Sequence, residues 1–148
     1  MRLVALDPGG TTGTCLAVDG LVRARGQIAG CHHKHLYHAL EAFMPDRIVC
    51  EGFTFRQSKD QIVLDSVEYI GVTKLYCQDK NVPYIEQTSA QGKASSENVF
   101  WNMDKLKAVG LWLEGQPHAN DATSHMLYYM TFTLKQPHYL NILKGHGF

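Results

Sequence analysis

The stretch VALDPGGTTG, residues 4–13, joins an apolar segment to an acidic residue and then to a flexible turn. Residues 3–6 are all apolar, which is typical of a strand buried on both faces, and Asp7 follows where that strand leaves the core. Pro8 and the two glycines after it favour a turn, and the segment beyond them predicts a second strand. A carboxylate at such a place needs a partner, and both a metal ion and a phosphate group fit.

Length and composition limit the possible classes of protein. The 148 residues can bury a full core but are few for two ligand-binding lobes, so we expect one domain over residues 1–148. Basic and acidic residues number 14 each, so no general basic surface indicates nucleic acid, although a local group of Lys and Arg can still contact phosphates. No segment is apolar over the length of a membrane span, and the 4 Cys lack a CxxC motif. We therefore expect a cytoplasmic protein with free thiols and no membrane partner.

The spacing of apolar residues predicts an α/β fold. Strands are expected over residues 2–7, 13–18, 21–28, 47–53 and 82–87. Helices are expected over residues 33–44, 59–79 and 118–134, with a shorter helical segment over 100–112 and a polar loop over 88–98. In the helix over 59–79, the stripe of Val63, Val67, Ile70 and Leu75 predicts the side that faces the core.

Acidic residues occupy the ends of three predicted elements. Asp7 ends the first strand, Glu51 lies near the end of the fourth, and Asp121 lies near the start of the last helix. If the first and fourth strands are neighbours, Asp7 and Glu51 lie side by side, and a helix crossing that edge adds Asp121. Because like charges repel at short range, such a cluster needs divalent cations, and oxygen ligands suit Mg²⁺ or Mn²⁺. Two such ions can activate water and stabilise the leaving oxygen in phosphodiester hydrolysis.

Three segments of the sequence resemble a known family. They resemble the signature segments of the RuvC-like Holliday junction resolvases, which belong to the RNase H-like superfamily. The three segments are LDPGGTTG at residues 6–13, the acid of VCEGF at residues 49–53, and HANDA at residues 118–122. The order and spacing of the segments also match. The resemblance implies an RNase H-like mixed five-stranded sheet flanked by helices. It further implies a homodimeric endonuclease that uses two Mg²⁺ ions, with Mn²⁺ substituting, to cut paired strands of a four-way DNA junction.

The resemblance also implies roles for individual residues. Asp7, Glu51 and Asp121 match the metal ligands of the family. His118, one helical turn before Asp121, matches the position that the family fills with Asp or His, where it is placed to act as a fourth ligand or a proton shuttle. Lys93 is the nearest match to a lysine that contacts the scissile backbone, and it would neutralise the charge that develops there.

DNA contacts and the dimer are implied in the same way. The family often has an aromatic residue after the second acid that wedges against junction bases, and Phe53 and Phe55 flank that place. Because the net charge is zero, the basic residues must concentrate near the active face. The candidates for DNA contact are Arg56, Lys59, Lys93, Lys105 and Lys107. The second apolar side of the helix around residues 59–79, with Tyr69, Val72 and Tyr76, would form the homodimer interface.

Other interpretations stay open. Within the nucleases, an RNase H-like enzyme acting on flaps, forks or RNA:DNA hybrids has the same motifs. Outside them, a catalytically inactive binder of branched DNA is a further possibility.

DPGGTTG also resembles the phosphate loop of sugar kinases and actin-like ATPases. Those proteins need two lobes and a second Asp-Gly loop, and HANDA is not such a loop. The run at residues 31–35, CHHKH, favours a solvated helix start over a zinc site, since adjacent residues cannot all face one ion. We expect His125 to be a core or surface histidine with satisfied hydrogen bonds.

Overall fold

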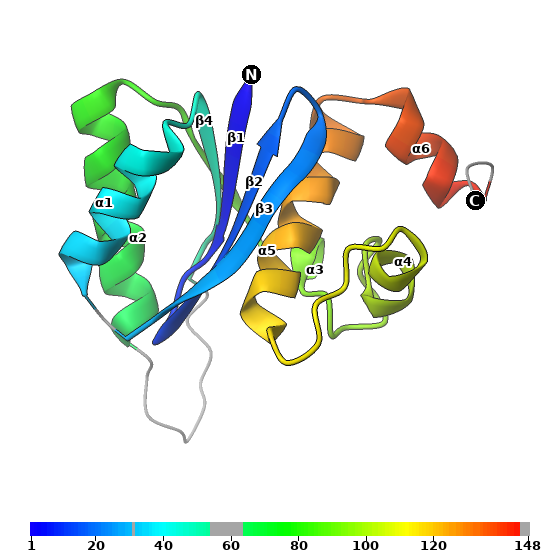
Figure 1. The fold of residues 1–148 in the computed structure, drawn as a ribbon, viewed down its shortest axis with the longest axis horizontal. Coiled ribbons are helices and arrows are strands. Elements are labelled where there is room, and N and C mark those ends of the chain that lie inside the picture. Colours follow the sequence, from blue (N-terminus) through cyan, green and yellow to red (C-terminus); the bar gives the residue numbers. More distant parts are fainter. Residues whose placement is uncertain (31, 54–63, 146–148) are drawn as a thin grey trace.

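A mixed sheet forms the centre of the molecule (Figure 1). The computed structural model describes residues 1–30, 32–53 and 64–145. The strands are β1 (Arg2–Asp7), β2 (Thr11–Val18), β3 (Leu21–Ala29), β4 (Arg47–Glu51) and β5 (Tyr84–Gln87), in the order β3-β2-β1-β4-β5. The first three are antiparallel neighbours, whereas β4 runs parallel to β1 and β5 runs parallel to β4. The expected five-stranded α/β fold is confirmed.

Strand register places the ends of the three parallel strands at one level. Leu6 pairs with Cys50, so Asp7 and Glu51 end adjacent strands side by side, and Glu51 in turn pairs with Gln87 at the end of β5. Side chains alternate between the two faces of a strand, so these three end residues project from the same face of the sheet. The predicted adjacency of the first and fourth strands is therefore confirmed.

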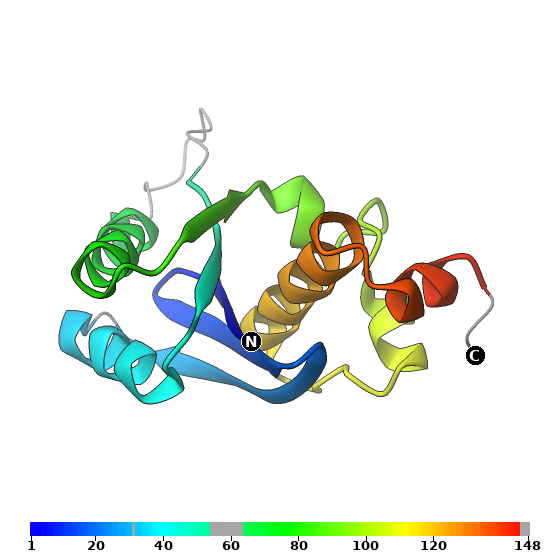
Figure 2. The same ribbon diagram turned by 90° about the horizontal axis from the view of Figure 1, so that it is seen from above.

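Helices cover both faces of the sheet. They are α1 (His33–Phe43), α2 (Leu64–Lys80), α3 (Ser89–Gly92), α4 (Met103–Ala108), α5 (Pro117–Tyr128) with its π-helical continuation η1 (Tyr129–Thr133), and α6 (Pro137–Leu143). Viewed from above, α1 and α2 lie on one face of the sheet, whereas α5 lies on the other with α3 beside it and α4 and α6 beyond it (Figure 2). Among the described residues, no helix is long and apolar enough to cross a membrane.

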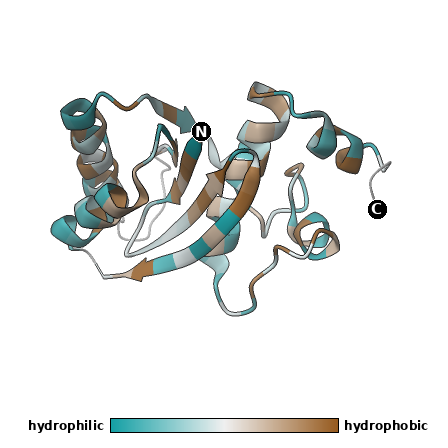
Figure 3. Cartoon of the chain, turned by 45° about the horizontal axis from the view of Figure 1, so that its top comes forward, coloured by the Kyte–Doolittle hydropathy of each residue, from teal (hydrophilic) through white to brown (hydrophobic). Residues whose placement is uncertain are grey.

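Two cores hold these layers together because β1 is buried on both faces. Val4 and Leu6 pack toward α1 and α2, and Leu3 and Ala5 pack toward α5. Along β3, the outer strand, hydrophilic residues occupy the middle and hydrophobic residues the two ends (Figure 3). On β2, a Cβ built on Gly13 would overlap the carbonyl of His118, so a glycine there lets the start of α5 approach the sheet.

The orientation of α2 differs from the prediction. Val67 and Leu75, assigned to the core stripe, are 42% and 52% exposed, whereas Tyr69 and Tyr76, assigned to the outer side, are buried. Tyr69 donates a hydrogen bond to the Gly30 carbonyl at 2.6 Å, which anchors the tyrosine side of the helix. Because α2 is apolar on two sides, its periodicity did not determine which side packs. Val63 and the rest of the expected first turns lie outside the described residues.

Smaller differences concern the ends of elements. β2 begins at Thr11 rather than residue 13, the fourth strand ends at Glu51, and α6 was not predicted. Within the expected loop over 88–98, Thr88 and Gln91 form a capping box that starts the short helix α3. Pro137 begins α6, whose Tyr139 packs into the core beside α5.

Candidate active site

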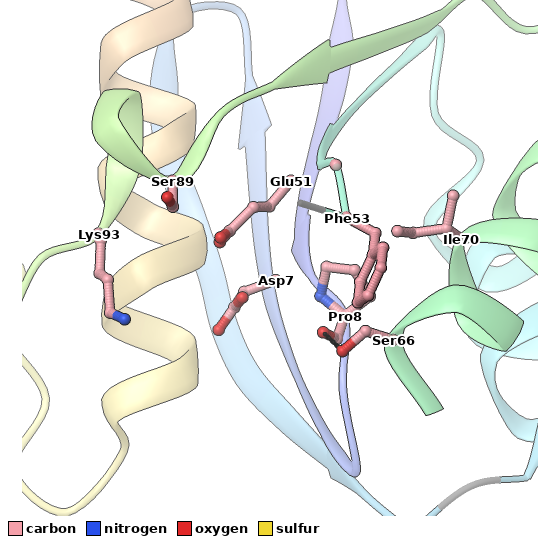
Figure 4. A pocket seen from close by; sticks show the side chains of 9 residues that line it. Asp7, Pro8, Glu51, Phe53, Ser66, Ile70, Ser89 and Lys93 are labelled. Atoms are coloured by element: carbon pink, nitrogen blue, oxygen red, sulfur yellow. Dashed lines mark hydrogen bonds between the residues drawn. The ribbon is translucent and has the colours of Figure 1, made fainter. Parts of the chain in front are cut away.

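Asp7 and Glu51 line a pocket of about 310 Å³ where β1 and β4 end. In Figure 4 their carboxylates lie at its centre, with Ser89 and Lys93 of the α3 segment on one side. The opposite side is formed by Pro8, Phe53, Ser66 and Ile70. One wall is therefore polar and basic, the other is largely apolar, and the two acids stand between them.

The Asp7 carboxyl is buried and close to other acids. Burial raises its pKa to about 9, and the charges of Glu51 and Asp121 add to that effect, as does a hydrogen bond with Glu51, whereas Lys93 opposes it. At neutral pH without a cation, Asp7 therefore keeps its proton and donates a hydrogen bond to the Glu51 carboxylate. The Asp7 Oδ2 atom also lies 3.0 Å from Nδ1 of His118.

Glu51 is the ionised member of this pair. Burial would raise its pKa, but the hydrogen bond and charge of His125 and the hydrogen bond from Asp7 outweigh it, so the net shift is downward. Its Oε2 atom lies 3.0 Å from Nε2 of His125. The two neighbouring carboxyls thus hold different protonation states because their environments differ.

Asp121 approaches the pair from the first half of α5. Its Oδ1 atom accepts a hydrogen bond of 2.9 Å from the backbone N–H of Ala94. Burial raises the pKa of Asp121; the Ala94 hydrogen bond opposes this, and the charge of Glu51 raises it further. The structure therefore brings together the three predicted acids, from β1, β4 and α5, closely enough for their charges to interact.

His118 and Gln27 fix the start of α5. His118 is half-exposed and contacts Asp7. The backbone N–H groups of His118 and Ala119, which have no partner inside the helix, donate to Oε1 of Gln27 on β3 at 3.0 and 3.3 Å. Sequence reasoning missed Gln27, because a cap supplied from 91 residues away leaves no local signal.

His125 is buried and hydrogen-bonded, as expected, but it is also part of the site. Its ring nitrogens face Gln87 and Glu51 at 2.6 and 3.0 Å. The sequence offered one signal for this contact, since His125 lies four residues after Asp121 and therefore on the same side of the helix.

The predicted basic and aromatic contacts separate into two groups. Lys93 lines the pocket, and its positive charge lowers the pKa values of Asp7, Glu51 and Asp121. Phe53, 42% exposed, also lines it. The two α4 candidates, Lys105 and Lys107, do not line the pocket. Three further candidates lie outside the described residues, namely Phe55, Arg56 and Lys59.

The donor chemistry of the site fits a divalent cation. Carboxylate oxygens are the ligands that Mg²⁺ and Mn²⁺ prefer, and three carboxylates converge here, with His118 in contact with Asp7. Burial, and then the charges of Glu51 and Asp121, raise the pKa of Asp7, and a cation beside these groups would oppose that shift. In residues 1–30, 32–53 and 64–145, no three His, Cys, Asp or Glu side chains already stand in a metal-binding arrangement. The acids instead form hydrogen bonds with protein groups, such as Asp121 with Ala94. Binding an ion would therefore require the carboxylates to turn toward a common point.

Solved structures of Holliday junction resolvases share this fold. The Thermus thermophilus RuvC structure matches with a TM-score of 0.66 at 17% identity, over 91% of this chain and 96% of that chain. The yeast mitochondrial resolvase Ydc2 matches with a TM-score of 0.57 at 14% identity, over 97% and 83% of the two chains. The Fowlpox virus resolvase, solved with Holliday junction DNA, gives a TM-score of 0.56 at 14% identity, over 88% and 99%. No family model and no curated protein matches the sequence. The resemblance predicted from the motifs is thus confirmed for the fold.

Proposed function

We propose that this protein, which has the fold of the RuvC-like resolvases, is a divalent-cation-dependent endonuclease that cuts four-way DNA junctions. The observation that carries the proposal is the convergence of Asp7, Glu51 and Asp121, from three separate elements, beside a pocket with a basic wall. Burying mutually repelling carboxylates is unfavourable for the fold, so their convergence indicates a ligand that neutralises them. The motif order and the shared fold point to the same chemistry.

Each residue of the proposed site has a distinct task. Two Mg²⁺ ions would be held by Asp7, Glu51, Asp121 and His118, and Mn²⁺ would substitute for Mg²⁺. Bound ions of this kind activate water as Lewis acids and stabilise a leaving oxygen. Asp7 must release its proton to serve as a ligand, and His118, whose Nδ1 atom lies 3.0 Å from Oδ2 of Asp7, would bind beside it. Lys93, on the pocket wall, would hold the scissile phosphate and neutralise the charge that develops on it.

We further propose that the nuclease acts as a homodimer. Leu64, Val67 and Leu75 on α2 are 61%, 42% and 52% exposed and form an apolar outer side of the helix. A second copy covering this side would place two pockets on one junction, which explains why cutting should be paired and symmetric. Phe53, exposed at the pocket, would contact the junction bases.

The experiment that tests the function compares DNA shapes. Purified protein is incubated with labelled four-way, three-way, flap and linear DNA and with an RNA:DNA hybrid, in Mg²⁺ or EDTA, beside the variant Asp7→Asn. We expect paired nicks in the four-way junction that need Mg²⁺ and are absent in the variant, while junction binding remains. Cutting of flaps or hybrids alone would reject junction resolution in favour of another RNase H-like nuclease. No cutting with any metal would reject the nuclease and favour nucleotide binding.

A further inference from the structure

His125 occupies a position that connects three elements of the site. Its side chain is 0% exposed, and it lies on α5 between the ends of β4 and β5. Nε2 contacts the Glu51 carboxylate at 3.0 Å, and Nδ1 contacts the Gln87 side chain at 2.6 Å. Gln87 is itself fixed, because its backbone carbonyl accepts a 2.8 Å hydrogen bond from Gly52 directly after β4.

The His125 ring also supports α3. A Cβ built on Gly92 would overlap the ring, so the last residue of α3 packs directly on the imidazole. The next residue, Lys93, forms the basic wall of the pocket. One buried side chain therefore contacts the acid at the centre of the site and the turn that carries its lysine.

We infer that His125 is a positioning residue, which together with Gln87 orients the Glu51 carboxylate for cation binding and sets the place of Lys93. The inference rests on the proposed function. It follows from geometry: a carboxylate side chain has several rotatable bonds, and a hydrogen bond from a rigid, fully packed ring restricts it to one orientation. An apolar residue would fill the same core space, so packing alone does not explain an imidazole with both nitrogens satisfied.

The test separates orientation from stability. His125→Phe fills the space of the ring without its hydrogen bonds, His125→Gln keeps a donor group, and Gln87→Met removes only the partner of Nδ1. The matched control is Ser124→Ala, which removes a buried 2.7 Å hydrogen bond to Trp101 from the same helix, away from the pocket. Thermal melting establishes that each variant is folded.

Three readouts are used. Mg²⁺ affinity is measured by calorimetry without DNA, and the single-turnover cutting rate and junction affinity are measured separately. We expect His125→Phe to weaken Mg²⁺ binding and to slow cutting, each by about 10- to 100-fold, with junction affinity unchanged. His125→Gln should recover part of the loss, and Ser124→Ala should behave as the wild type. If His125→Phe does not fold, Gln87→Met should show the same pattern to a smaller extent.

The outcomes distinguish the inference from the function on which it rests. If folded His125→Phe binds Mg²⁺ and cuts DNA as the wild type does, the positioning role is overturned. If His125→Phe does not fold, the same result in folded Gln87→Met overturns it. A wild-type protein that binds Mg²⁺ but cuts no substrate would reject the nuclease, while the Mg²⁺ titrations of the variants would still decide the inference. A wild-type protein that binds no Mg²⁺ would overturn both.

Discussion

Asp7 and His118 lie 111 residues apart in sequence, yet Oδ2 of the first and Nδ1 of the second are 3.0 Å apart. The contact joins the end of β1 to the first turn of α5 and connects the sheet to the helix that carries Asp121. Its effect is that any change in how α5 sits on the sheet also changes the surroundings of Asp7. The charge of Asp7 and the seating of α5 are therefore coupled.

The stability of the cation-free protein should depend on the ionisation of Asp7. Burial raises the pKa of this carboxyl from its ordinary value of 3.8 to about 9 in the folded protein, so its ionisation opposes folding. The stability associated with this group is fully present below pH 3.8 and is lost as the pH rises toward 9. In EDTA, Asp7→Asn should therefore be more stable than the wild type near pH 8, by at least about 2 kcal/mol, because folding of the wild type requires the Asp7 carboxyl to take up a proton that the unfolded chain has lost. Urea unfolding at several pH values measures it.

The difference between variant and wild type must grow with pH, since asparagine does not titrate. Glu51 acts in the opposite direction, because its lowered pKa gives stability that is present above pH 4.5 and is lost as the pH falls. Both proteins retain Glu51, so its contribution largely cancels in the comparison. A difference that is constant from pH 4 to pH 9 would contradict the raised pKa of Asp7.

Lys93→Ala should slow cutting by about 100-fold, since it removes a positive charge at the pocket wall where the reacting phosphate would lie. Junction affinity should change little, because one phosphate contact among many is lost. Single-turnover rates and junction binding titrations measure the two effects. Lys107→Ala is the matched control: Lys107 lies over the Trp112 ring, outside the pocket, and its loss should affect binding rather than the rate. Unchanged cutting by Lys93→Ala would remove Lys93 from the proposed mechanism.

Gly13→Ala should displace the start of α5, because the added methyl group would overlap the carbonyl of His118. We expect a loss of about 3 kcal/mol in the free energy of unfolding, as for an overpacked core. Gly71→Ala is a suitable control, because a Cβ at Gly71 meets no other part of the described chain within 4 Å beyond its own helix, and it should leave the fold intact. Chemical denaturation of both variants measures the difference. Equal stabilities would show that the helix moves away at little cost.

Leu75→Glu should shift the protein from dimer to monomer and raise the dimer dissociation constant at least about tenfold, since it places a charge on the exposed apolar side of α2. Leu21→Glu is the matched control, because Leu21 is exposed to a similar extent, 50%, but lies at the start of β3. Light scattering over a range of concentrations reports the mass. A wild type that is monomeric throughout, or a Leu75→Glu variant as dimeric as the control, would exclude the α2 interface.

The sequence predicted that Asp7 and Glu51 lie together because their signal is local. Asp7 and Glu51 each follow an unbroken apolar strand, and parallel pairing then brings such ends together. The capping box of Thr88 and Gln91, which starts α3, was also visible in the sequence but fell within a polar stretch that favoured a loop.

The remaining features depend on tertiary packing. Which side of α2 faces the core was decided by partners such as Gly30, which accepts the hydrogen bond of Tyr69, and not by the spacing of apolar residues. The contacts of His125 with Gln87 and of Gln27 with His118 join elements that are distant in sequence. Such pairs cannot be identified before the sheet order and the position of α5 are known.

The position of α5 after all five strands in the sequence has a consequence for synthesis. A nascent chain that ends before Pro117 carries Asp7 and Glu51, but His118, Asp121 and His125 have not yet been made. Although the strands that position the first two acids are already complete, the third acid and the ring that contacts Glu51 arrive only with the segment from Pro117 onward. In the proposed nuclease, incomplete chains on the ribosome would therefore be unable to cut DNA, and activity would begin only when α5 docks against the sheet.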